Sequence, residues 1–313
     1  MVRLTPKSQR FMSQCGRSDR MSFPPDDELL PKTYLRVTKD PNKSIQQRYN
    51  FAHQYLRKKM EDSGLLTNRY PQRHGQLSPS DELTAALEDT YNYQKSHIDT
   101  FVRALDLFKV RKPDADGLQV IDIGAGACTT RFAMEQHWPQ TLQYIDYKPI
   151  EPNNGMRHLG KQLSTIFGWD SPSYLQDIQE ITPAYSPVAK RCLITMSYVI
   201  GQNTFTDHDI WKLSKFITET INKLWLPPVE ILITTATTAK SKENWNDLFL
   251  HFKHDKKLNP TQVHIDEAGR GVWQSGSSMH QEQLPQKYPT PSGGWTTNYP
   301  KNKNVGMGYW NIG

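Results

Sequence analysis

Hydrophobic residues in the first third of the chain recur at the three- and four-residue spacing of a helix. One such series runs over residues 44–61 and a second over residues 80–108. Their apolar positions are Ile45, Tyr49, Ala52, Tyr55, Leu56, Leu83, Leu87, Tyr91, Ile98, Val102 and Leu105. We therefore predict a helical N-terminal region over residues 44–115. It follows a basic arm or linker over residues 1–43, which shows no sustained period and is expected to be disordered.

After this region, short β-branched runs alternate with helical stretches. Strands are expected over residues 118–123, 142–147, 174–177, 191–198, 229–235 and 262–265. Helices are expected between them, over residues 129–138, 156–167, 207–225 and 242–254. Strands that alternate with helices form parallel sheets with both faces covered. The pattern predicts an α/β core over residues 116–270, built as a doubly wound, mostly parallel sheet with a helical N-terminal extension.

The C-terminal part of the chain changes in composition. Residues 271–304 are rich in Gly, Ser, Pro and Gln and contain few aliphatic side chains, so we expect a long loop or a disordered insertion there. Aromatic residues return over residues 305–313, whose sequence begins VGMGYWNI. That stretch is typical of a closing strand of the sheet.

The overall composition excludes two classes of protein. Hydrophobic residues make up 36% of the chain, its mean hydropathy is −0.71, and no apolar run approaches the length of about 20 residues that spans a bilayer. A membrane channel or transporter is therefore excluded, and we expect no membrane partner. The three cysteines, Cys15, Cys128 and Cys192, lie too far apart in sequence for a disulfide framework or a CxxC zinc site, and we expect no metal.

The positive charge of the chain is concentrated near its N-terminus. Residues 1–74 hold 15 basic and 7 acidic residues, whereas the remainder holds 23 basic and 25 acidic ones. A localised basic excess favours a phosphate-rich partner such as RNA. The alternative is a solvated arm that only keeps the protein soluble. The first twenty residues are rich in Arg and Ser, as in a mitochondrial transit peptide, but their apolar residues form a poor helical stripe. We therefore expect a cytoplasmic protein, with mitochondrial targeting as the alternative.

A glycine turn carries the strongest functional signal. The sequence VIDIGAGA over residues 120–127 joins an apolar strand to a helix, and Gly124 and Gly126 permit torsions and close approaches that side chains would block. In this order of strand, turn and helix, the free N–H groups at the start of the helix point toward the space above the strand ends. Asp146, 24 positions after Asp122, has the spacing of a carboxylate that accepts ribose hydroxyls. Two other interpretations remain: a turn used only for packing, and a dinucleotide site, although Thr129 stands where that motif prefers Gly or Ala.

These residues resemble motif I of class I S-adenosylmethionine-dependent methyltransferases, and the similarity covers about residues 85–250. The resemblance implies S-adenosylmethionine as the cofactor. It implies that Asp122, Gly124, Ala125 and Gly126 flank the amino-acid part of that cofactor, and that Asp146 holds its ribose.

Asp177 follows the third expected strand, at the place where the same enzymes put a polar residue near the adenine amino group. The alternative for Asp177 is a turn or helix N-cap carboxylate.

The end of the fourth expected strand is where such enzymes carry out their chemistry. There the chain reads SYVI, which resembles the strand ending of a ribosomal-RNA methyltransferase-like family of small-subunit and mitochondrial proteins. We predict Ser197, Tyr198 and His208 as catalytic candidates: Tyr198 could line the cofactor, and His208 could serve as a base near neutral pH. The alternative for His208 is an exposed position on a helix. Cys192 begins the buried strand, which favours a structural role over that of a nucleophile.

The sequence therefore predicts an S-adenosylmethionine-dependent methyltransferase, a transferase of one-carbon groups. Its acceptor is unresolved, with RNA favoured slightly over a small molecule because of the basic N-terminal part. The alternative is a methyltransferase-fold protein that has lost catalysis and acts as a binding or scaffold module, since a fold does not fix a function.

Overall fold

The computed structural model describes part of the chain, and the described ranges are residues 44–62, 82–177, 180, 189–200, 207–224, 229–254, 260–265, 271–274, 279–285, 287–289, 295–296 and 302–312. The predicted basic arm over residues 1–43 lies outside them. So do several segments between the later elements, including residues 201–206.

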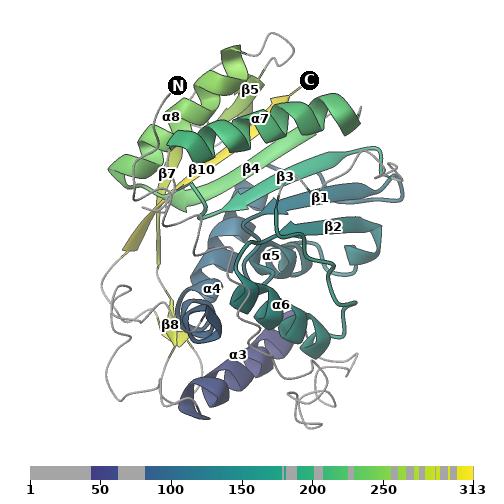
Figure 1. The fold of residues 1–313 in the computed structure, drawn as a ribbon, viewed down its shortest axis with the longest axis vertical. Helices are drawn as coiled ribbons and strands as arrows, with labels where there is room; N and C mark the ends of the chain where they lie inside the picture. Colours follow the sequence, from purple (N-terminus) through teal and green to yellow (C-terminus); the bar gives the residue numbers. More distant parts are fainter. Residues whose placement is uncertain are drawn as a thin grey trace, which may run out of the picture.

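Two helices form the described N-terminal part, as the spacing of apolar residues predicts. They are α3 (Ile45–Asp62) and α4 (Glu82–Leu107). The Tyr49 hydroxyl of α3 donates a 3.2 Å hydrogen bond to the Gln94 side chain of α4, and both residues are buried. Figure 1 shows α4 beneath the sheet, between the sheet and α3. The N-terminal helices are thus packed on the α/β core rather than separate from it.

The sheet has eight strands, and its four-strand parallel part is formed by β1 (Leu118–Ile123), β2 (Ile145–Ile150), β3 (Cys192–Ser197) and β4 (Val229–Ala236). The strand order is β2-β1-β3-β4-β10-β5-β6, in which β10 (Asn302–Ile312) runs antiparallel to both of its neighbours. The remaining strands are β5 (Pro260–Ile265), β6 (Gly271–Gln274) and β7 (His280–Pro285), and a separate pair is formed by β8 (Tyr288–Pro289) and β9 (Trp295–Thr296). The predicted doubly wound α/β fold is confirmed, and its sheet is mixed, because the ladders beyond β4 are antiparallel.

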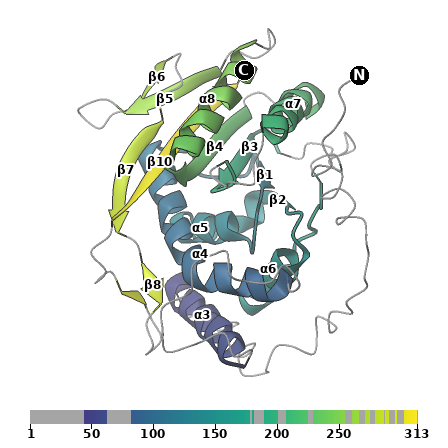
Figure 2. The same cartoon turned by 60° about the vertical axis from the view of Figure 1, so that its left-hand side comes forward.

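Helices cover both faces of this sheet, as Figures 1 and 2 show. One face carries α3, α4, α5 (Thr129–His137) and α6 (Asn154–Ile166), and the other carries α7 (Asp207–Leu224) and α8 (Ala239–His254). Successive residues of β1 pack alternately against the two helical layers, because successive side chains of a strand point to opposite faces of the sheet. Leu118 and Val120 pack against α3 to α6, whereas Ile121 and Ile123 pack against α7 and α8.

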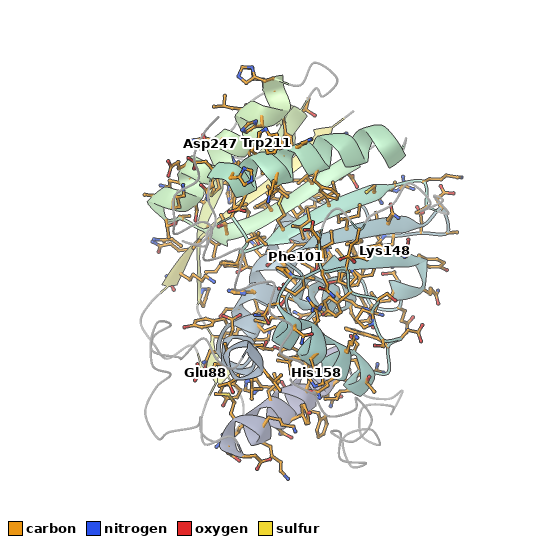
Figure 3. All side chains as sticks on the ribbon, in the orientation of Figure 1. Glu88, Phe101, Lys148, His158, Trp211 and Asp247 are labelled. Atoms are coloured by element: carbon orange, nitrogen blue, oxygen red, sulfur yellow. The ribbon has the colours of Figure 1, made fainter. Side chains whose placement is uncertain are left out.

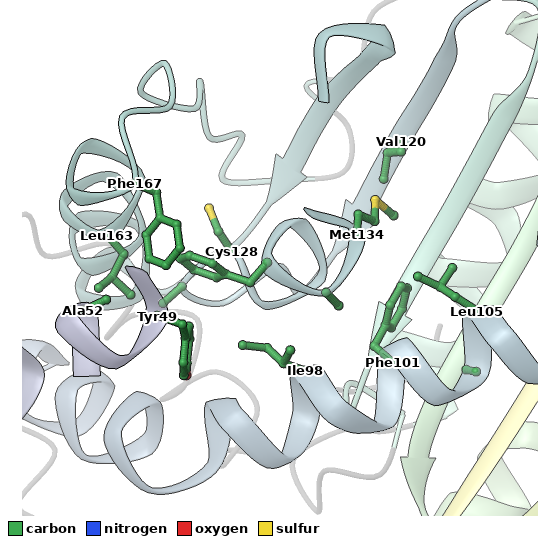
Figure 4. Close-up of a cluster of buried hydrophobic side chains, with 14 of the residues drawn as sticks. Tyr49, Ala52, Ile98, Phe101, Leu105, Val120, Cys128, Met134, Leu163 and Phe167 are labelled. Atoms are coloured by element: carbon green, nitrogen blue, oxygen red, sulfur yellow. The ribbon is translucent and has the colours of Figure 1, made fainter. Parts of the chain in front are cut away.

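The core beneath the sheet is rich in aromatic side chains. Figure 4 shows Phe101 and Leu105 of α4 pointing toward the strands, with Tyr49 and Phe167 gathered near the start of α5. Both α4 residues are fully buried. Burying a large side chain contributes about 1.5–3 kcal/mol, so this cluster ties α4 firmly to the sheet.

Two predicted strands differ in position from those observed. The strand expected over residues 142–147 begins three residues later, because Leu142–Tyr144 form a 3-10 turn in which the Tyr144 N–H bonds to the Thr141 carbonyl at 2.9 Å. The third expected strand, over residues 174–177, is reduced to a single parallel bridge between Ile150 and Leu175. The first of these shifts moves the end of β2, and with it the acidic residue at that end.

The segment expected to be a loop, residues 271–304, contains strands β6 to β9. The first half of β10 pairs with β7 in register from Asn302↔Pro285 to Met307↔His280. Burial in β7 alternates along the strand, so backbone pairing and one covered face stabilise a stretch with few aliphatic residues.

Candidate functional site

The turn that follows β1 has three left-handed residues. Gly124, Gly126 and Cys128 have φ values of 65°, 53° and 63°. The N–H groups of Gly124 and Ala125 both donate to the Ile150 carbonyl, at 2.9 and 3.0 Å, so the turn is bound to the end of β2. These two N–H groups are therefore occupied by the protein itself.

The two glycines of the turn have different surroundings. An ideal Cβ on Gly124 would lie 2.4 Å from the Cγ2 atom of Val199, the second residue after β3. On Gly126 the only described atom within 4 Å would be Met156 Sδ, at 4.0 Å. The expectation that Gly124 makes room for a ligand is therefore wrong at its Cα, because Val199 fills that space. The opening in the turn lies at Gly126.

Glu151 completes the turn, and it was not among the residues predicted from the sequence. It follows the last residue of β2, is 8% exposed, and accepts hydrogen bonds from the N–H of Gly126 (2.8 Å, Oε2) and of Asn153 (2.9 Å, Oε1). Burial raises the pKa of its carboxyl, while these two N–H donors and the nearby Arg157 lower it. A carboxylate at the carboxyl end of β2 thus reaches directly into the glycine turn.

Asp146 does not occupy that place, which corrects the sequence-based prediction. It pairs in register with Gln119 near the amino end of β1, whereas Gly124 follows the carboxyl end of that strand. Its carboxylate is 45% exposed, contacts Lys148 Nζ at 2.8 Å and accepts a 3.3 Å hydrogen bond from the Gln119 side chain. The reason is the three-residue shift of β2, which puts Asp146 at the start of the strand instead of its end. Figure 3 labels Lys148 on this strand.

Asp122 is a buried structural carboxylate and has no exposed surface. It accepts hydrogen bonds from the hydroxyls of Thr130, Tyr147 and Thr195, the last at 2.7 Å. Burial raises its pKa to about 6, although each hydroxyl acts in the opposite direction. The prediction that Asp122 flanks a cofactor is not supported by this geometry, because its side chain is enclosed beneath the turn.

Asp177 follows a segment that is bonded to the end of β2. The Leu175 carbonyl accepts from the Glu151 N–H, and the Leu175 N–H donates to the Pro149 carbonyl, both at 2.9 Å. Asp177 is exposed two residues further on, and its N–H donates to Glu180 Oε1 at 3.2 Å. The contact with Glu180 is that of a turn, and the role of Asp177 near the adenine stays a prediction.

Strand β3 ends at Ser197, and the next residue, Tyr198, contacts α4. Ser197 Oγ accepts a 3.2 Å hydrogen bond from Thr234, and the Tyr198 hydroxyl lies 3.2 Å from Thr100 Oγ1. Tyr198 has a φ of 61°, which is rare for a bulky residue, and burial raises the pKa of its phenol. Strained residues of this kind gather at functional sites.

Two side chains that sequence reasoning missed contact the Tyr198 ring. The His97 imidazole stacks on it, with 3.8 Å between ring centroids and 16° between planes, and Lys303 Nζ lies 3.7 Å from its centroid. Burial lowers the pKa of His97 well below its usual value, and Lys303 lowers it further. Burial also lowers the pKa of Lys303 to about 7, against the attraction of Asp89. The sequence offers no local signal for this pair, because the contact joins α4, β3 and β10.

His208 lies apart from this cluster. It is exposed in the first turn of α7, and its ring stacks near Trp211, which Figure 3 labels on that helix. Within the described ranges no hydrogen bond joins His208 to Ser197 or Tyr198. The geometry therefore favours the exposed helical position over the predicted catalytic base.

None of the helices in the described part of the chain combines the length and apolar character that a bilayer crossing requires.

Comparisons with known proteins found no matching family model and no matching curated protein. Several solved structures align with most of this chain at low sequence identity. A candidate class I S-adenosylmethionine-dependent methyltransferase from Listeria monocytogenes is 9% identical, with 86% of this chain and 69% of that chain covered and a TM-score of 0.43. A SAM-dependent methyltransferase from Aquifex aeolicus is 10% identical, with 76% and 100% covered and a TM-score of 0.40.

A third structure is that of the plantazolicin methyltransferase in complex with a monoazolic desmethylPZN analogue and SAH. It is 10% identical, with 86% of this chain and 96% of that chain covered and a TM-score of 0.40.

Proposed function

We propose that this chain is an S-adenosylmethionine-dependent methyltransferase in which Glu151, rather than Asp146, holds the cofactor ribose. The observation that carries the proposal is the 2.8 Å hydrogen bond from the Gly126 N–H to Glu151 Oε2. It joins the glycine turn after β1 to an acid at the carboxyl end of β2, the edge at which open α/β sheets bind ligands. When bound, the cofactor supplies an electrophilic methyl group on a sulfonium sulfur.

The acceptor positions of the Glu151 carboxylate suit the hydroxyls of a ribose. Each carboxylate oxygen has two acceptor positions, and in the structure each accepts one backbone N–H. One position on each oxygen is left for a sugar hydroxyl, so the carboxylate is already oriented for two neighbouring hydroxyls. Asp177, two residues beyond the bridge to β2, is proposed to contact the adenine end.

The turn itself suits a ligand that approaches at Gly126. Its Cα is open apart from Met156, whereas Gly124 is closed by Val199. The bonds from Gly124 and Ala125 to Ile150 hold the turn in place before any ligand arrives. A preformed site loses little conformational freedom on binding.

Calorimetry tests the proposal. Wild type should bind S-adenosylmethionine and its product S-adenosylhomocysteine, and Glu151→Ala should weaken both about 10- to 100-fold, as expected for the loss of two hydrogen bonds to an anion. Asp146→Ala is the matched control and should bind like wild type. Absence of binding by wild type would overturn the proposal, and equal binding by Glu151→Ala would remove Glu151 from the site. Binding by wild type without turnover of any acceptor would favour the inactive scaffold instead.

We also propose RNA as the acceptor class. Support comes from the basic excess of residues 1–74 and from the resemblance of the SYVI strand ending to a ribosomal-RNA methyltransferase-like family. Phosphate contacts make affinity fall steeply with salt. We expect binding to a mixed RNA pool to weaken at least tenfold between about 50 and 200 mM salt. Affinity that is insensitive to salt would favour a small-molecule acceptor.

A further inference from the structure

We propose that Lys303, held against the Tyr198 ring at the carboxyl end of β3, is the general base that takes the proton from an acceptor hydroxyl or amine during methyl transfer. This inference rests on the proposed function and adds to it a catalytic group and a class of nucleophile.

The position of Lys303 is fixed by elements from distant parts of the chain. It lies at the start of β10, where it pairs in register with Leu284 of β7. Strand β7 is bound to α4 by an ion pair between Glu282 and Arg103 Nε at 2.9 Å. Just beyond β7, Lys287 Nζ contacts Asp99 of the same helix at 2.7 Å. Lys303 is therefore on a supported strand, which a positioned catalytic group requires.

The chemical surroundings of Lys303 suit a base. Within the described part of the chain, no carboxylate lies within ion-pair distance of its Nζ. The charged and titratable groups that face it are Asp89 and His97 of α4 and Tyr198 after β3. Burial lowers the pKa of Lys303 to about 7, so a large fraction of the amine is neutral near physiological pH. A base with a pKa near the working pH is the most effective.

The same cluster adjoins the proposed cofactor turn. Val199, which closes the Cα of Gly124, is the residue after Tyr198, whose ring Lys303 contacts. Ser197 and Thr100 add hydroxyls at the same end of β3. The cluster thus lies beside the turn on the ligand-binding edge of the sheet, where an acceptor has to meet the methyl donor.

The proposed step balances in atoms and charge. The acceptor oxygen or nitrogen forms a bond to the methyl carbon as the sulfur–carbon bond breaks, and the electron pair of that bond stays on sulfur. The acceptor proton moves to the neutral Nζ of Lys303, which becomes an ammonium group. Bulk water takes that proton after the products leave.

Lysine labelling at different pH values tests the placement of Lys303 without a known acceptor. Brief acetylation of the full chain followed by mass spectrometry gives the pH at which each lysine becomes half reactive. We expect a midpoint near 7 for Lys303 in the free protein. With S-adenosylmethionine this midpoint should fall about half a unit or more below that with S-adenosylhomocysteine, because a nearby sulfonium cation disfavours a second positive charge. Lys112, exposed at the other end of β1, is the control and should not respond.

The outcomes separate this inference from the proposed function. If both compounds bind and the Lys303 midpoint is the same with each, Lys303 does not face the methyl donor and the inference is overturned while the methyltransferase stands. If neither compound binds, both fail. A lysine that only packs on Tyr198 would not distinguish a sulfonium from a thioether.

Substitution gives a second readout with any acceptor that is turned over. Lys303→Arg keeps the positive charge but cannot accept a proton near neutral pH. We expect its turnover to fall about 10²- to 10⁴-fold with cofactor affinity unchanged. Lys112→Arg is the matched control. Full activity in Lys303→Arg would overturn the inference.

Discussion

Asp122 and Thr195 face each other across the parallel strands β1 and β3, and the Thr195 hydroxyl donates a 2.7 Å hydrogen bond to the buried carboxylate. The carboxylate lies directly under the glycine turn. It connects β1 to β3, which ends directly before Tyr198, so the charge state of Asp122 bears on the stability of the whole site.

This carboxylate should make stability depend on pH. Because burial raises the folded-state pKa from 3.8 to about 6, the free energy of unfolding should fall as pH rises from about 4 through 6 and then level off. A shift of about two pKa units corresponds to about 3 kcal/mol. Asp122→Asn should lack this step, and Asp146→Asn, at an exposed carboxylate, should retain it. Urea unfolding at several pH values checks this, and the same slope in Asp122→Asn would contradict it.

The glycine turn gives a prediction that separates backbone strain from steric conflict. Gly124 and Gly168 have φ values of 65° and 72°, but only Gly124 meets a neighbour, the Val199 side chain at 2.4 Å from an ideal Cβ. We expect Gly168→Ala to cost about 1–2 kcal/mol for its left-handed backbone. Gly124→Ala should cost about 1–3 kcal/mol more. Thermal or denaturant unfolding measures both, and Val199→Ala should recover part of the extra cost in the double variant.

A buried ion pair near the amino ends of β3 and β4 offers a third test. Arg191 Nη2 lies 2.6 Å from Glu230 Oε2, with side chains 6% and 11% exposed, and the Tyr309 hydroxyl donates to the other carboxylate oxygen. Arg191→Met leaves this carboxylate without its cation and should destabilise the fold by about 3–5 kcal/mol. Adding Glu230→Gln should restore much of the loss. If the double variant is no more stable than Arg191→Met in chemical unfolding, the pairing explanation is wrong.

Thiol chemistry gives a fourth prediction. Cys128 and Cys192 are both fully buried, and burial raises their pKa values to about 11 and about 12. The thiolate is the reactive form, so neither should react with iodoacetamide at pH 8 in the native protein. In a Cys15→Ser background, both should label together on unfolding. Rapid native labelling of Cys192 would contradict its place at the start of a buried strand.

The sequence predicts those elements whose side chains face the core on both sides. Strands β1, β3 and β4 are rich in apolar and β-branched residues and are buried along almost their whole length. The helices between them begin within a few residues of the predicted positions. The predicted start of β2 differs from the observed one at Leu142. Its apolar side chain is typical of a strand, but it belongs to a turn in which the Thr141 carbonyl accepts a hydrogen bond. A local pattern of apolar and polar residues does not indicate which backbone carbonyl will accept a hydrogen bond from a given residue.

The errors at the site follow from that shift and from long-range contacts. Strand β2 ends at Ile150 instead of Tyr147, so the acidic residue at its end is Glu151. A sequence prediction with the correct strand boundary would have identified Glu151. Lys303 could not be found this way. The contacts of Lys303 involve three elements that come together only in the folded chain. In the sequence, its own segment has the composition of a polar loop.

Strand β10 enters the sheet between β4 and β5, although both of these precede it in the chain. Until it arrives, β4 exposes a full row of unpaired N–H and C=O groups along an apolar edge, the kind of edge that recruits other chains. Because contacts between distant segments form slowly, insertion of this strand is the step that we expect to limit folding. Aggregation during synthesis or refolding should therefore begin at β4, and a soluble peptide with the β10 sequence should suppress it.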